Sequence, residues 1–286
     1  MQDSGLSTWL SSLPILVIGS GTFALMLVAG ALGYVMRRWQ AAHARHKKRE
    51  SAESVAQEGY LLGSVLGLLG LLLAFTFGMV LNRYEARREL VTREANGIGT
   101  AYLRAQFLDE PYRSHLSALL VDYTQNRIEL ASGRGDSSAY AIRNDQLLTD
   151  TWSEVRAARE SAMAHGVTTA LLMAFNEVID IDTERKIAWE LRVPGEVLLL
   201  LLIYLAATAG VVGHQVDGPR GRRAAFALFA LTSLSITVIT DLNRPMSGHA
   251  RESQKAMLML LQSLRAQPPQ VFDRSIPPPR QLGAQP

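Results

Sequence analysis

The chain has 286 residues, of which 48% are hydrophobic and only 19% are charged. Soluble domains carry about 25% charged residues, so this composition favours a membrane protein. The apolar content excludes a disordered chain, and the lack of cysteine excludes disulfide scaffolds, thiolate metal sites and cysteine nucleophiles. The net charge of +3 is too small over this length to indicate nucleic-acid binding.

Four apolar segments predict four transmembrane helices. Residues 13–36 and 59–82 contain no charged side chain, 193–213 contains only Glu196, and 224–243 contains only Asp241. A helix rises about 1.5 Å per residue, so each segment is long enough to cross a hydrocarbon core of about 30 Å. Residues 1–12 carry no Lys or Arg. They therefore do not fit a signal peptide, and the first span is expected to be retained.

Basic residues concentrate in two connections between the spans. Residues 37–58 contain six Lys and Arg, and residues 214–223 contain three Arg. The positive-inside rule predicts that both connections are cytoplasmic loops and that the N-terminus and residues 83–192 lie on the other side of the membrane. Two alternatives stay open. The loops bind anionic headgroups on either side, or the arginines that follow the second span (Arg83, Arg87, Arg88 and Arg93) set the opposite orientation.

The segment 83–192 predicts an all-α extramembrane domain inserted between the second and third spans. It carries 14 basic and 17 acidic residues, unlike the spans. No turn signal separates it from the second span, which predicts one continuous helix across that boundary. Four apolar faces follow helical spacing. They are Val91, Ala95, Ile98, Tyr102 and Ala105; Leu116, Leu119, Leu120 and Tyr123; Ile142, Leu148, Trp152 and Val155; and Leu171, Leu172, Phe175, Val178 and Ile179.

The C-terminal part divides into two segments. Residues 244–267 predict an amphipathic helix with an apolar face of Met257, Leu260, Leu261 and Leu264, either interfacial or packed on the bundle. Residues 268–286 contain six of the 11 prolines. This composition predicts an extended, mobile tail.

A stripe of small residues marks the second span. The spacings of three and four place its members on one helix face. The members are Gly59, Gly63, Gly67, Gly70, Ala74 and Gly78. Close helix packing is the favoured interpretation, and a narrow ion path is the alternative. Phe75 and Phe77 flank the stripe, as a hydrophobic constriction or in contact with lipid.

Charged and catalytic signals are sparse elsewhere. Asp241 and Arg244 lie at the end of the fourth span and predict an interfacial pair. The acidic residues Glu177, Asp180, Asp182 and Glu184 do not follow calcium-loop spacing and predict a solvated face. The histidines are scattered, and no phosphate-binding or zinc motif occurs. We therefore expect no metal, no cofactor and no enzymatic activity.

Several motifs resemble the bestrophin-like domain family of bacterial membrane proteins. They are the run from Phe77 through Asn82-Arg83-Tyr84-Glu85-Ala86-Arg87, the triplet Glu94-Ala95-Asn96, the run Glu110-Pro111-Tyr112-Arg113, and the ending Asp241-Leu242-Asn243-Arg244-Pro245. The resemblance covers roughly 55–250. It differs from true bestrophins in having one aromatic residue, Tyr84, between Arg83 and Glu85 where bacterial bestrophins have two.

Bestrophins are pentameric anion channels, so the resemblance implies a homo-oligomer in the lipid bilayer that conducts chloride or other small anions. It implies a pore lined by the second span, and it places the middle region in the cytosol, against the basic-loop prediction. The pore-lining candidates are Gly63, Gly67, Gly70, Ala74, Phe75, Phe77 and Gly78, and the anion-attracting candidates at the mouth are Asn82, Arg83, Arg87 and Arg88. The alternative function is a non-conducting scaffold or sensor whose helical domain binds a partner protein.

Overall fold

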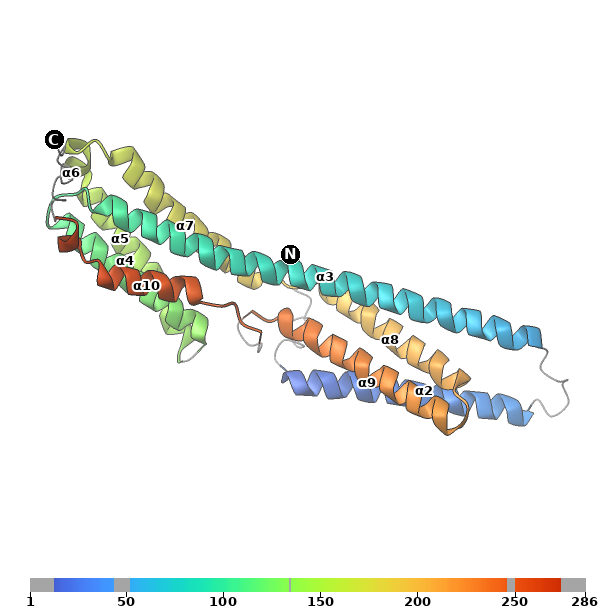
Figure 1. The fold of residues 1–286 in the computed structure, drawn as a ribbon. Helices are drawn as coiled ribbons and strands as arrows, with labels where there is room; N and C mark the ends of the chain where they lie inside the picture. The colour runs from blue at the N-terminus through green and yellow to red at the C-terminus, as the bar shows by residue number, and fades with distance from the viewer. Residues whose placement is uncertain (1–12, 44–51, 134, 246–249, 274–286) are drawn as a thin grey trace, which may run out of the picture. The chain divides into compact units, whose positions relative to one another are not determined.

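The computed structural model describes residues 13–43, 52–133, 135–245 and 250–273, and every regular element within these ranges is a helix (Figure 1). The all-α prediction is therefore confirmed. The chain forms two compact units, the first from residues 1–86 and 189–251 and the second from residues 87–188 and 252–286. Each unit combines segments that are distant in the sequence.

The first unit holds the apolar helices. They are α2 (Ile15–His43), the first part of α3 (Ala52–Ala105), α8 (Gly195–Gln215) and α9 (Gly218–Leu242). The structure contains four helical segments that are long and apolar enough to cross a membrane, as predicted. The two basic connections are shorter than expected, because α2 continues to His43 and only two residues separate α8 from α9. Asp217 caps the N-terminus of α9, and its carboxylate accepts a hydrogen bond from the Gly218 N–H.

Glycines bring α2 and α8 into backbone contact. A Cβ atom on Gly33 would overlap the Gly210 carbonyl, and one on Gly213 would overlap the Gly30 carbonyl. Such small residues let helices approach closely in lipid, where no hydrophobic effect drives their association. Close packing at glycines in the described part of the chain therefore occurs between the first and third spans, whereas packing at the stripe of the second span stays a prediction.

The second unit is a helical bundle around its own core. It contains the end of α3, α4 (Tyr112–Ser132), α5 (Ser137–Ala157), α6 (Arg159–Ala164), α7 (Thr168–Glu190), α10 (Lys255–Ala266) and the 3₁₀ turn η1 (Pro269–Val271). The predicted continuous helix from the second span is confirmed, because α3 is unbroken from Ala52 to Ala105. All five residues of its predicted face (Val91, Ala95, Ile98, Tyr102 and Ala105) are buried. Gly133, with a φ of 60°, ends α4 in a left-handed conformation.

One predicted face is only half correct, because Val155 is buried and Leu148 packs against the core, but the other two members do not. Ile142 and Trp152 are exposed on α5, and the buried face consists of Asn144, Leu147, Thr151 and Val155. Two of these four residues are polar, so apolar spacing alone selects the neighbouring face. On α7, Leu172 is likewise exposed, whereas the rest of its predicted face is buried or partly buried.

The C-terminal segment packs on the bundle, one of the two alternatives. The α10 side chains Met257, Leu261 and Leu264 are buried, and Met257 and Leu264 belong to the core of the second unit. Residues 268–273 are not extended as predicted, because they include the 3₁₀ turn η1 and contact the bundle. The Tyr102 hydroxyl donates to the Gln267 carbonyl at 2.8 Å, and Asp273 pairs with Arg113 at 2.6 Å. The remainder of the predicted tail, 274–286, lies outside the described residues.

Candidate functional site

The small-residue stripe on α3 forms a surface without neighbours in the described part of the chain. Gly63, Gly67, Gly70 and Ala74 are exposed, and Gly78 is partly exposed. A Cβ atom added at any of the four glycines would meet no described atom within 4 Å. The opposite face of α3, at Leu69, Thr76 and Val80, is buried. No helix in the described part of the chain therefore covers the stripe.

The two phenylalanines near the stripe are both exposed, but they point in different directions. Residues two positions apart on an α-helix lie about 160° apart around its axis. Phe75 and Phe77 of one chain therefore do not face the same axis. Phe77, three positions after Ala74, lies about 60° from it, whereas Phe75 lies about 100° away. Phe77 is thus the nearer neighbour of the stripe.

The candidate mouth residues that follow the stripe, Asn82 and three arginines, occupy different environments. Asn82 and Arg88 are exposed, and Arg83 is half-buried. The Nη1 atom of Arg83 has no hydrogen-bond partner among the described residues. Arg87 does not fit the prediction that it attracts anions, because its side chain is buried and its Nε atom pairs with the Glu252 carboxylate at 2.6 Å. Glu252 therefore compensates the charge of Arg87.

The end of α9 ties the apolar helices together through side-chain to backbone hydrogen bonds. Asn243 accepts from the Val193 N–H at 3.0 Å, and Arg244 donates to the Leu13 carbonyl at 2.6 Å. Asp241 accepts from the Ala250 N–H at 3.0 Å. Arg244 thus fixes the start of α2 and Asp241 fixes the chain after α9, and the pairing of these two residues stays a prediction.

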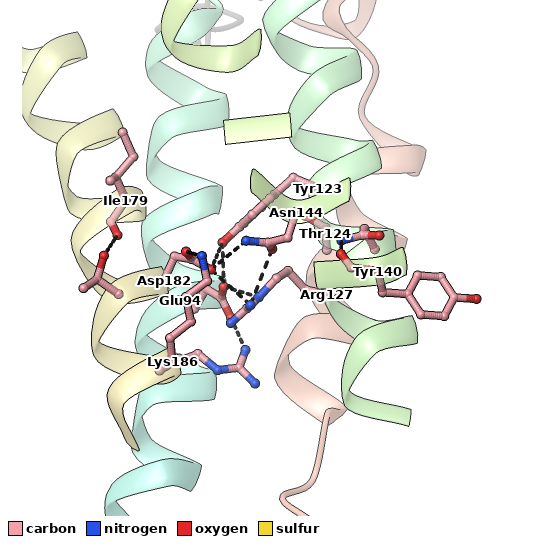
Figure 2. A network of polar contacts seen from close by, with 12 residues as sticks. Glu94, Tyr123, Thr124, Arg127, Tyr140, Asn144, Ile179, Asp182 and Lys186 are labelled. Atoms are coloured by element: carbon pink, nitrogen blue, oxygen red, sulfur yellow. Dashed lines mark hydrogen bonds and ion pairs between the residues drawn. The ribbon is translucent and has the colours of Figure 1, made fainter. Parts of the chain in front are cut away.

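A buried network of charges crosses the core of the second unit and was not predicted (Figure 2). Arg127 on α4 contacts Glu94 on α3 at 2.7 Å and Asp182 on α7 at 3.1 Å. Arg185 contacts the second oxygen of Glu94. Lys186 contacts the second oxygen of Asp182 at 2.8 Å. Both carboxylates therefore have a cation at each oxygen.

Neutral side chains complete this network. The Tyr123 hydroxyl donates to Glu94 at 2.9 Å, and the Asn144 amide donates to Asp182 at 3.0 Å. Burial raises the pKa of Tyr123 well above its usual value, and the negative charge of Glu94 raises it further. Tyr123 therefore stays protonated and keeps donating. Because α3, α4, α5 and α7 each contribute to it, the network fixes the packing of four helices.

The network corrects the interpretation of the acidic residues on α7. Asp182 is buried in the ion network, whereas Glu177 and Asp180 are exposed and Glu184 pairs with Arg93 at 2.7 Å. Helical spacing carries a signal for these positions. Glu94 lies three residues after Val91, and Asp182 lies four residues after Val178. A charged residue at the helical spacing of a buried apolar face predicts a buried ion pair. Charged residues that are merely close together in the sequence do not predict one.

A family model described as the bestrophin-like domain matches residues 23–257. The chain belongs to the bestrophin-like domain family. A comparison with curated proteins found no significant match. The fold of this bestrophin-like protein is similar to crystal structures of a bacterial bestrophin homologue from Klebsiella pneumoniae.

A tryptophan-to-alanine variant of that homologue aligns with a TM-score of 0.63 at 14% identity, covering 92% of this chain and 99% of that chain. The structure phased with zinc aligns with a TM-score of 0.60 at 15% identity, covering 92% and 100%. At this identity the likeness establishes a shared fold over nearly the whole length of both chains.

Proposed function

We propose that this bestrophin-like protein is an oligomeric anion channel, with a pore lined by the small-residue stripe of α3. The open stripe carries the proposal, because Gly63, Gly67, Gly70, Ala74 and Gly78 form a face of an apolar helix that no other described part of the chain covers. Several copies arranged around an axis shield this face from lipid and leave a narrow path lined by backbone dipoles. Family membership and the bestrophin fold support the same arrangement.

Within this proposal, Phe77 forms the neck of the pore. It is closer in direction to the stripe than Phe75, which faces lipid or a neighbouring copy. Asn82, Arg83 and Arg88 form the mouth, since Arg83 and Arg88 place positive charge one to three turns after the stripe. Arg87 is left out of the mouth, because it is buried and paired.

Cysteine substitution tests the pore lining directly, because the native chain contains no cysteine. We expect Gly70→Cys and Ala74→Cys to react with a charged, water-soluble thiol reagent in membranes. The matched control is Leu231→Cys, at an exposed apolar position on α9. Protection of both stripe cysteines, at the level of the Leu231 control, would contradict a water-filled path along α3.

Residues 87–188 of the second unit are proposed to form the extramembrane domain between the second and third spans. The basic connections place it in the periplasm of a bacterial inner-membrane protein, whereas the resemblance to bestrophins places it in the cytosol. Ala141→Cys on α5 separates these placements, because Ala141 is exposed. Labelling of intact spheroplasts by an impermeant maleimide supports the periplasmic placement, and labelling only after lysis establishes the cytosolic one.

A further inference from the structure

An apolar groove runs between α2 and α9 at the end of the first unit that carries Arg222. Its cavity has a volume of about 290 Å³ and is lined on the α2 side by Leu27, Gly30 and Ala31 and on the α9 side by Phe226 and Phe229. This volume is at the lower end of the range of small-molecule sites. The lining is almost entirely apolar, with Arg222 as the charged residue at the groove.

Packing between α2 and α9 holds the walls of the groove. A Cβ atom on Gly30 would come within 2.9 Å of the Phe229 ring, so the glycine lets Phe229 pack directly against α2. Phe23 contacts Phe226 edge to face, with 5.2 Å between ring centroids. Aromatic pairs of this geometry are stabilising, so the α9 wall is held in place.

Positive charge gathers where the groove ends. A second hollow, lined by Pro219, Arg222, Arg223 and Phe226, shares Arg222 and Phe226 with the groove. Arg222 and Arg223 are exposed and have no ion pair or hydrogen bond within the described ranges. The carboxylate nearby in the chain, Asp217, already accepts from the Gly218 N–H and lies 3.6 Å from Arg37.

We propose that this groove binds an anionic phospholipid, with an acyl chain along α2 and α9 and the phosphate at Arg222 and Arg223. A groove that is apolar along its length and ends at two arginines without a described partner matches a molecule with an apolar chain and an anionic head. Clusters of arginine beside a span attract anionic lipids at about 1 kcal/mol for each residue, which corresponds to about a fivefold change in affinity. A free phosphate has no apolar group that would contact the apolar part of the groove.

Native mass spectrometry of the full-length protein in detergent tests the proposal. The probes are phosphatidylglycerol, phosphatidylcholine with the same acyl chains, and glycerol phosphate. We expect phosphatidylglycerol to bind several-fold more tightly than phosphatidylcholine, and glycerol phosphate to bind far more weakly than either. Equal binding of the two lipids would overturn the role of the arginines, and binding of glycerol phosphate as tight as phosphatidylglycerol would overturn the role of the groove.

Two variants locate the lipid. Arg222→Gln should lower phosphatidylglycerol affinity about fivefold and leave phosphatidylcholine unchanged. Ala31→Phe fills the groove at an exposed position and should weaken both lipids. The controls are Arg156→Gln, an exposed arginine on α5, and Ala227→Phe, an exposed alanine of α9 outside the groove lining. If each variant binds lipid like its control, the site lies elsewhere. Melting temperatures equal to those of the controls exclude misfolding as the cause.

Discussion

Replacing Arg127 by methionine removes the cation that joins Glu94 to Asp182 in the second unit. The Arg127 side chain is 0% exposed, and its two partners are 0% and 2% exposed, so water cannot replace the lost charge. Removal of one partner from a buried ion pair typically costs about 3–5 kcal/mol, because the remaining charge loses its compensation while it stays buried. Glu94 keeps Arg185 and Asp182 keeps Lys186, so each carboxylate loses one of two cations. We therefore expect Arg127→Met to lower the free energy of unfolding by about 3 kcal/mol, at the lower end of this range.

Arg93→Met is the matched control on α3. Arg93 pairs with Glu184 at 2.7 Å, but both side chains are 47% exposed. Solvent screens such a pair, so its loss should cost less than about 1 kcal/mol. Urea denaturation of the full-length protein in detergent, followed by circular dichroism, measures both variants. Equal destabilisation by the two substitutions would refute the argument from burial.

A double variant checks that charge, rather than lost volume, explains the effect. Arg127→Met combined with Glu94→Gln removes both charges of one buried contact, so the double variant should lose less stability than the sum of the two single variants. The interaction free energy between the two positions then follows from the double-mutant cycle. Additive destabilisation would show that the Glu94–Arg127 contact contributes nothing to stability.

Three further predictions concern packing, the end of α9 and pH. Gly33→Leu should prevent the first unit from folding, whereas Gly21→Leu, where an added Cβ meets no described atom, should be tolerated; size-exclusion profiles in detergent compare them. Asn243→Ala leaves a buried backbone N–H unpaired and should cost about 1–3 kcal/mol in thermal unfolding. A hydrogen bond with His165 lowers the pKa of Asp109 in the folded protein. The ionised Asp109 therefore stabilises the fold above the ordinary aspartate pKa of about 3.9, and this stabilisation is lost as pH falls through the lower folded pKa. Asp109→Asn should reduce the acid dependence of the melting temperature, and a pH profile equal to that of the wild type would contradict this role of Asp109.

The sequence predicts the helices well where apolar residues alone define them. The long α3 follows from the lack of breaking signals after the second span, and its buried face follows from regular apolar spacing. The prediction fails where polar residues are buried. Asn144 and Thr151 shift the buried face of α5, and Asp182 is buried because Arg127 of α4 and Lys186 of its own helix pair with it.

The candidate pore is predicted only in part, for a related reason. The spacing of small residues in the sequence reveals the stripe on α3. The sequence does not reveal which face of α3 the other helices cover, and this decides whether the stripe is exposed. The pairing of Arg87 with Glu252 joins residues 165 positions apart, which no local pattern reveals. The contacts of residues 268–273 likewise involve distant partners, because Phe272 lies against Tyr102 and Asp273 pairs with Arg113.

Chloride efflux from liposomes that contain the purified protein tests the proposed channel most directly. We expect the wild-type protein to release chloride. Ala74→Leu, which narrows the stripe, should reduce the release, and Leu231→Ala on α9 should leave it unchanged. Liposomes that stay tight to chloride with correctly folded protein, or equal release from Ala74→Leu and wild type, would contradict a pore along α3.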